Sequence, residues 1–228
     1  MSATSPPPAS RREVPAAARI VGCCGIAAFF TANLGWLLGG LAQPEAYSPT
    51  RDDISDLGAL TADEPWLYNQ IGANLSGLLM LAFAGALWWA LSPDALGRVG
   101  ASAVAVAGAG IFLDGMFRLD CRGIDTGCHN ASWHSHAHKV ESSVTGAALL
   151  AAPLILAFAF RRIPGWRGAW VPSLATLPLV VVANLVFSLW GGGAATRAAT
   201  FVLTGWLAFV SLWFLRTGRT DAWPARAS

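Results

Sequence analysis

Six long apolar stretches dominate this chain of 228 residues. A helix needs about 20 apolar residues to cross the roughly 30 Å hydrocarbon core of a bilayer, and each stretch is close to that length. Backbone polar groups in lipid must be hydrogen-bonded within the protein, which favours helices, and the alternation of a membrane barrel is absent. The sequence therefore predicts an all-α, polytopic bundle of six transmembrane helices, at 20–41, 68–91, 99–117, 140–160, 171–190 and 198–215.

The composition excludes several other classes of protein. Only 12% of the residues are charged, whereas soluble domains carry about 25%. No basic run with interleaved aromatic residues is present, so nucleic acid is not an expected partner. The pair Arg11-Arg12 before the first stretch resembles the start of a secretory signal, but signal cores are only about 7–15 residues long. We therefore interpret residues 20–41 as a retained first span.

The arginines and lysines predict the orientation of the bundle. With both termini in the cytoplasm, ten of the fifteen basic residues lie on the cytoplasmic side, as the positive-inside rule requires. This threading predicts a multi-pass protein of the cytoplasmic membrane with most acidic residues on the outer face. The expected parts are an N-terminal tail (1–19), a six-helix domain (20–216) with outer loops at 42–67 and 118–139, and a C-terminal tail (217–228).

The first outer loop contains a cluster of aspartates. Ser48-Pro49 is a typical helix start, and Gly58 a typical stop, so we expect a short interfacial helix from Pro49 to Leu57. Asp52, Asp53 and Asp56 also match the spacing with which isoprenoid synthases hold magnesium and a diphosphate, and carboxylate oxygens suit that ion. The alternative is a solvated acidic loop near a helix N-terminus.

The second outer loop holds all the histidines and two of the four cysteines. Cys121 and Cys128 flank a short glycine-containing segment on the oxidising side of the membrane, which favours a disulfide, with a cysteine–histidine metal site as the alternative. If a helix begins near Trp133, then His134, His138 and Glu141 share one stripe and could bind zinc. His136 would join them only in an extended segment.

Further ligands or partners for this cluster would come from other segments. Asp120, or Asp56 of the first loop, is the expected additional ligand, and His138 oriented by Asp120 could instead act as a general base without metal. Asp114 lies near the outer end of the third stretch, where an acid is a functional candidate. An ion pair with Arg118, four residues later, accounts for it equally well. Solvated loop histidines remain the alternative to any site.

The outer-loop motifs resemble those of a bacterial family of six-helix membrane proteins catalogued as a domain of unknown function. The resemblance rests on Tyr47-Ser48-Pro49, on Ile54-Ser55-Asp56-Leu57-Gly58-Ala59, on an Asp after the third span and on a His at the start of the fourth. It would cover about residues 20–215. It implies a fold but no reaction, and the matching positions are Ser55, Leu57, Gly58, Asp120 and His138. The segment from Cys121 to His136 departs from the pattern.

Three functional hypotheses follow. The first is a membrane enzyme that uses a divalent metal, zinc in particular, at an outer-face Asp/His site and acts on a lipid-like or other hydrophobic small molecule. The second is an isoprenoid-handling, terpene cyclase-like enzyme with magnesium. The third is a non-catalytic sensor, assembly factor or carrier. The candidate catalytic residues are Asp56, Asp114, Asp120 and His138; the candidate cofactor ligands are Asp52 and Asp53; the candidate metal ligands are His134, His136, His138 and Glu141.

Overall fold

Each predicted stretch forms a helix of membrane-spanning length in the computed structural model, which describes residues 16–217. These residues contain no strand, so the predicted all-α class with six spans is confirmed. Residues 16–19 already belong to the first helix and Thr217 to the last, and the rest of the two predicted tails lies outside the described residues. The spans are α1 (Ala16–Leu41), η2 (Leu67–Leu75) continued by α2 (Ser76–Leu91), α3 (Ala95–Asp114), α4 (Trp133–Arg162), α5 (Trp170–Phe187) and α6 (Gly192–Thr217).

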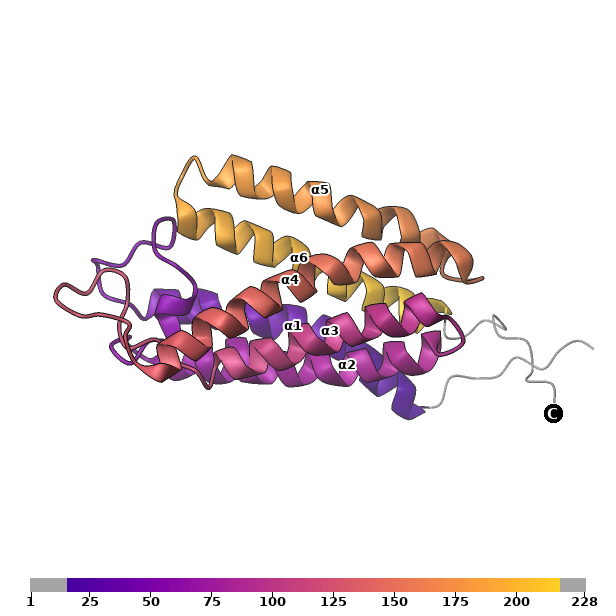
Figure 1. Ribbon diagram of the computed structural model, residues 1–228, viewed down its shortest axis with the longest axis horizontal. Coiled ribbons are helices and arrows are strands. Elements are labelled where there is room, and N and C mark those ends of the chain that lie inside the picture. Colours follow the sequence, from indigo (N-terminus) through magenta and orange to yellow (C-terminus); the bar gives the residue numbers. More distant parts are fainter. Residues whose placement is uncertain (1–15, 218–228) are drawn as a thin grey trace, which may run out of the picture.

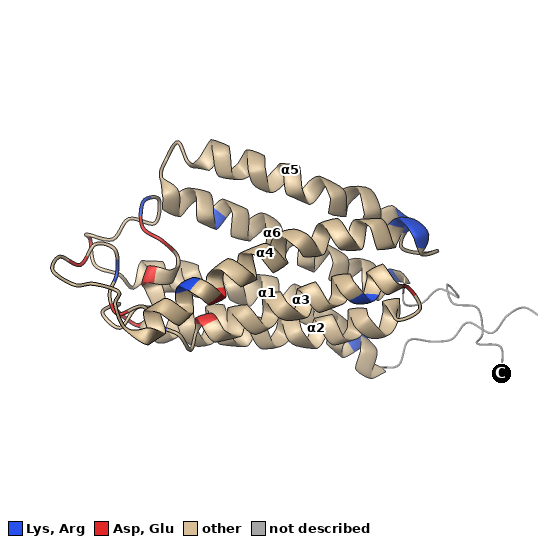
Figure 2. Cartoon of the chain, viewed as in Figure 1, with Lys and Arg blue, Asp and Glu red and all other residues tan. Residues whose placement is uncertain are grey.

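The helices run along the long axis of the molecule, and the two long loops gather at one end (Figure 1). We call this the loop end; it comprises residues 42–66, 115–132 and 188–191. The start of α1 and the end of α6 lie at the opposite end. Acidic residues are concentrated toward the loop end (Figure 2). The loops and the acids thus lie together, as the sequence predicted, while the side of the membrane they face remains a prediction.

Small residues allow the helices to approach closely. A Cβ added to Gly35 of α1 would overlap the backbone of Gly72, and one added to Gly77 of α2 would lie 2.7 Å from the carbonyl oxygen of Gly108 in α3. The glycine- and alanine-rich stretch of α3 buries Gly108 against α2 in this way. Such contacts supply dispersion energy where lipid offers no hydrophobic driving force.

Helix α4 starts seven residues before the predicted span because its first turn is capped. The Ser132 hydroxyl accepts a hydrogen bond from the Ser135 amide at 3.2 Å, as an N-cap should. The helix therefore begins at Trp133, and the polar segment from His134 to Glu141 lies on a helix, as the metal-site hypothesis required.

The predicted short helix from Pro49 to Leu57 is wrong. A single turn at Ser48 to Asp52 is followed by a 3-10 helix, η1 (Ser55–Gly58). The Asp52 carboxylate accepts a hydrogen bond from the Ser48 amide at 2.6 Å, and the carbonyl of Thr50 accepts one from the Ala194 amide at 2.9 Å. The segment is therefore held against the start of α6 by backbone contacts that a local helix signal does not reveal.

Candidate metal and proton-binding site

A buried cluster of three ionisable side chains joins the loop ends of α3 and α4. Asp114, His138 and Glu141 each offer a ligand atom, and these atoms all lie within 4.8 Å of one another. His138 is 6% exposed and Glu141 8%. It is the one group of three such side chains found between residues 16 and 217.

His138 and Asp114 are in direct contact. The Nδ1 atom of His138 lies 3.1 Å from Oδ1 of Asp114, yet this nitrogen makes no aligned hydrogen bond. Two ligands of one tetrahedral zinc ion, each at about 2.0–2.1 Å from the metal, lie about 3.3 Å apart. The 3.1 Å separation is that of an imidazole–carboxylate ion pair, and it is also close to the spacing of two ligands that share one cation.

Hydroxyl groups donate to an oxygen of each carboxylate. Tyr68 donates to Oδ2 of Asp114 at 2.7 Å, and Thr145 donates to Oε1 of Glu141 at 2.5 Å. On the other side of the imidazole, the Ser142 hydroxyl lies 3.5 Å from Nε2 of His138. Outer partners of this kind orient metal-ligating carboxylates and imidazoles.

Local structure explains how these residues meet. His138, Glu141 and Thr145 follow one another at helical spacings of three and four, so they share one face of α4. That face lies against Gly110 of α3, where an added Cβ would be 3.1 Å from Oε1 of Glu141. The absence of a side chain at Gly110 therefore leaves room for the carboxylate, one turn before Asp114.

Tyr68 reaches the cluster from an irregular helix. Residues Leu67–Leu75 form a π-helix that continues into α2. Such wide turns occur most often as short insertions at functional sites, where they redirect side chains. Here Asn69, one residue after Tyr68, donates to the Gly58 carbonyl at 3.1 Å and so ties the same helix to η1.

The two long loops are packed against each other above this cluster. The guanidinium of Arg118 donates to the carbonyl oxygens of Gly58 and Ala59, both at 2.8 Å. The Leu60 amide donates to the Leu119 carbonyl at 2.9 Å. Arg118 is thus used to hold the loops together and does not pair with Asp114, whose helix ends before it. The alternative of an ion pair between these two residues is therefore wrong.

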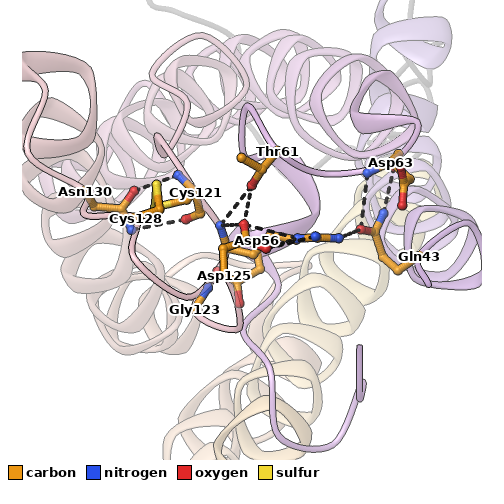
Figure 3. Close-up of polar contacts among 10 residues, drawn as sticks. Gln43, Asp56, Thr61, Asp63, Cys121, Gly123, Asp125, Cys128 and Asn130 are labelled. Carbon is orange, nitrogen blue, oxygen red and sulfur yellow. Dashed lines mark hydrogen bonds and ion pairs between the residues drawn. A yellow bond between two sulfur atoms is a disulfide. The ribbon is translucent and has the colours of Figure 1, made fainter. Parts of the chain in front are cut away.

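Figure 3 shows the outermost contacts between the loops. Arg122 forms an ion pair with Asp125 at 2.9 Å, and Thr61 of the first loop donates to the same carboxylate at 2.5 Å. The Gly123 amide donates to Oδ1 of Asp56 at 3.2 Å. Cys121 and Cys128 form a disulfide beside these contacts, which confirms the preferred interpretation of that pair.

The electrostatics of the loop carboxylates follow from these bonds. Burial raises the pKa of Asp56, partly opposed by the Gly123 amide. Hydrogen bonds from Ser132 lower the pKa of Asp120. Hydrogen bonds from Arg122 and Thr61 lower the pKa of Asp125 from 3.8 to about 2.

The shift at Asp125 predicts how the loop contact responds to acid. Because its folded pKa is depressed, its stabilising contribution is complete above pH 3.8 and is lost as the pH falls through about 2. We expect hydrogen exchange of the Arg122 amide, which donates to Asp125 at 2.9 Å, to lose protection over this window after correction for intrinsic rates. Asp125→Asn should remove the pH dependence; an unchanged profile in that variant would contradict the assignment.

The remaining predicted site residues lie elsewhere. His134 and His136 are exposed, and the ring of His134 stacks 3.6 Å from that of Trp133. Asp120 is not part of the buried group. Its carboxylate accepts a hydrogen bond from the Ser132 amide at 2.8 Å and so stabilises the start of α4. Asp53 is exposed. Of the predicted metal ligands, His138 and Glu141 come together, with Asp114 as the third member.

The family of the chain can be stated at this point. Residues 23–213 match the model of a family described as a protein of unknown function, DUF998. The chain belongs to the DUF998 family. This confirms the resemblance to a six-helix membrane family without established function. Comparison of this DUF998 protein with curated proteins and with solved structures found no match.

Two members of the buried polar site were missed from the sequence. Thr145 could have been found, because it extends the helical spacing of His138 and Glu141 by one turn. Tyr68 carries no such signal: it is separated from Asp114 by 46 positions and reaches it only through the packing of η2 on α3.

Proposed function

We propose that this DUF998 protein binds one divalent cation, zinc by its donor set, between Asp114, His138 and Glu141, and that it is a membrane-embedded, metal-dependent hydrolase for a lipid-like substrate. The observation that carries the proposal is the convergence of three ligand atoms, from Asp114, His138 and Glu141, within 4.8 Å of one another, two of them on buried side chains. Two carboxylates also supply the charge that a divalent ion needs in a buried position.

The number of ligands supports a catalytic role. Structural zinc sites are closed by four protein ligands, whereas catalytic sites use three and leave a position for water or substrate. A bound zinc ion lowers the pKa of its water and polarises a carbonyl or phosphoryl oxygen. Around it, Tyr68 and Thr145 would keep the carboxylates of Asp114 and Glu141 in one orientation.

The position of the site supports a hydrophobic substrate. Asp114 is the last residue of α3, and His138 and Glu141 lie in the first turns of α4, so the cluster is near the ends of two spans. Lipid head groups lie at this depth of a bilayer, and the disulfide suits the predicted outer, oxidising side. The aspartates of the isoprenoid hypothesis do not gather in this way, since Asp52 is bonded to the Ser48 amide and Asp56 to the Gly123 amide.

Elemental analysis of the full chain purified in detergent tests the proposal. We expect about one zinc per chain after equilibration with the ion, because three protein ligands that converge on one point bind it far more tightly than single surface groups do. Asp114→Asn, His138→Gln and Glu141→Gln should each reduce the content to background. The double substitution His134→Gln with His136→Gln is the matched control and should leave it unchanged.

The proposed hydrolase activity requires a separate measurement. The purified chain, mixed with a total bacterial lipid extract, should release a product detectable by mass spectrometry, and both chelation and Glu141→Gln should abolish that release. Metal binding without any product would retain the site and reject the hydrolase, in favour of a metal sensor. Metal bound by the parent and to the same extent by Asp114→Asn, His138→Gln and Glu141→Gln would reject the site itself.

A further inference from the structure

A buried arginine without a counter-ion lies at a second place in the molecule, on α6. Arg197 is 7% exposed and is more than four residues inside the start of the helix at Gly192. No carboxylate among residues 16–217 lies within ion-pair distance of it. Charges in such surroundings are normally paired, because an isolated buried charge is costly.

The hydrogen bonds of Arg197 leave part of the guanidinium unused. Its Nη1 atom donates to the carbonyls of Asp52 at 2.8 Å and Gly193 at 3.1 Å, and its Nη2 atom donates to the Tyr47 hydroxyl. A guanidinium has five N–H donors. Two therefore remain, and the Nε atom is among the buried polar atoms without a partner.

The neighbouring groups do not neutralise the cation. Burial raises the pKa of Tyr47 to about 12, so its hydroxyl is neutral at physiological pH. Two aromatic rings face the guanidinium, with its central carbon 5.7 Å from the centre of Trp36 and 5.9 Å from that of Tyr47. Cation–π contacts attract the charge but do not cancel it.

Arg197 also lines an apolar cleft at the loop end. The cleft has a volume of about 460 Å³, and its walls come from α1, α5, α6, the first loop and the α5–α6 connection, including Trp36, Pro49, Phe187, Trp190 and Ala198. Volumes of about 300–1,000 Å³ are typical of small-ligand sites. Its walls are almost entirely apolar, which suits a hydrocarbon chain, and the mostly buried Arg197 lies at its edge.

The depth of Arg197 suits a lipid head group. Five residues from Gly192 to Arg197 correspond to about 8 Å along the helix. Trp36 and Trp190 flank the same region, and tryptophan is typical of the interface between head groups and acyl chains. A guanidinium binds phosphate through paired N–H donors.

We propose that this cleft is a binding site for an anionic phospholipid, whose phosphate pairs with Arg197 and whose acyl chain lies between α5 and α6. The site is separate from the proposed metal cluster and does not depend on it. The phospholipid would supply the anion that the buried guanidinium lacks.

Native mass spectrometry of the full chain tests this proposal. In detergent with equal amounts of phosphatidylglycerol and phosphatidylcholine, we expect about tenfold preferential retention of phosphatidylglycerol. Both lipids offer a phosphate to Arg197, but phosphatidylcholine also carries its own ammonium cation and so brings no net negative charge to the unpaired guanidinium. Arg197→Gln should abolish the preference. Ala198→Phe fills the cleft and leaves the arginine in place, so it should reduce retention of both lipids. This second variant keeps the proposal testable if Arg197→Gln does not fold.

Two controls distinguish the outcomes. Ala175→Phe adds the same ring at an exposed position of α5 outside the cleft and should behave as the parent chain. Equal retention of the two lipids by the parent, or normal retention by Ala198→Phe, would overturn the proposal. Binding of free oleate without phosphatidylglycerol would also overturn it, because a fatty-acid carboxylate would then be the ligand.

Discussion

Removal of the divalent ion proposed for Asp114, His138 and Glu141 is expected to lower the free energy of unfolding by about 4 kcal/mol, if free zinc before removal is about 1,000 times its dissociation constant. The ion binds the folded chain and not the unfolded one, so its removal takes away the stabilisation that binding gives to the folded state. Without the ion, two carboxylates and one imidazole are left with ligand atoms within 4.8 Å of one another. Thermal unfolding in detergent, followed by circular dichroism with and without chelator, measures the effect.

The variants give this experiment its controls. Glu141→Gln retains the shape of the side chain and removes one charge, so its unfolding temperature should no longer respond to zinc or to chelator. The double variant at His134 and His136 should respond as the parent does, because both histidines are exposed. A parent chain whose unfolding temperature is the same in zinc and in chelator would argue that the cluster is an apo hydrogen-bonded network.

Gly77→Ala is expected to destabilise the bundle by about 3 kcal/mol, the upper end of the usual cost of overpacking. The added methyl group would lie 2.5 Å from the Phe112 nitrogen and 2.7 Å from the Gly108 oxygen. Both are backbone atoms of α3, so no side chain can turn aside and the two helices must separate. Because Phe112 is two residues before Asp114, zinc binding should weaken as well.

Gly85→Ala on the same helix is the matched control. Apart from its chain neighbours and the backbone of its own helix turns, no atom lies within 4 Å of a Cβ at that position. Alanine is a better helix former than glycine by up to about 1 kcal/mol, so this variant should be neutral or slightly more stable. Thermal unfolding of both variants measures the difference, and equal stability of the two would show that α2 and α3 are not packed as described.

The predicted positions of the helices were accurate for a simple reason. The spans of α1 and α2 end at Leu41 and Leu91, as the apolar stretches indicated, because the bilayer thickness sets the length of the stretch and of the helix alike. Helix ends were less predictable where polar residues continue the helix, as in the seven residues before Val140 that Ser132 caps.

The candidate site was only partly predictable. His138 and Glu141 share a face of α4 by spacing alone, so their proximity follows from the helix. Asp114 could be assigned to Arg118 or to a functional site with equal reason until tertiary structure placed Arg118 against Gly58 and Ala59. His134 and His136 share the local sequence of His138 but are exposed where His138 is buried, and composition does not distinguish them.

Local periodicity and hydropathy alone determined that this chain is a six-helix membrane protein, because bilayer thickness and backbone hydrogen bonding act on each segment separately. Which polar side chains meet was decided by tertiary structure. Tyr68 meets Asp114, and Arg197 meets Tyr47, across 46 and 150 positions. Contacts between residues so far apart in the sequence depend on how the helices pack. Packing is set by shape complementarity at glycines such as Gly77 and Gly110, and complementarity is a property of two helices that the sequence of one segment does not reveal.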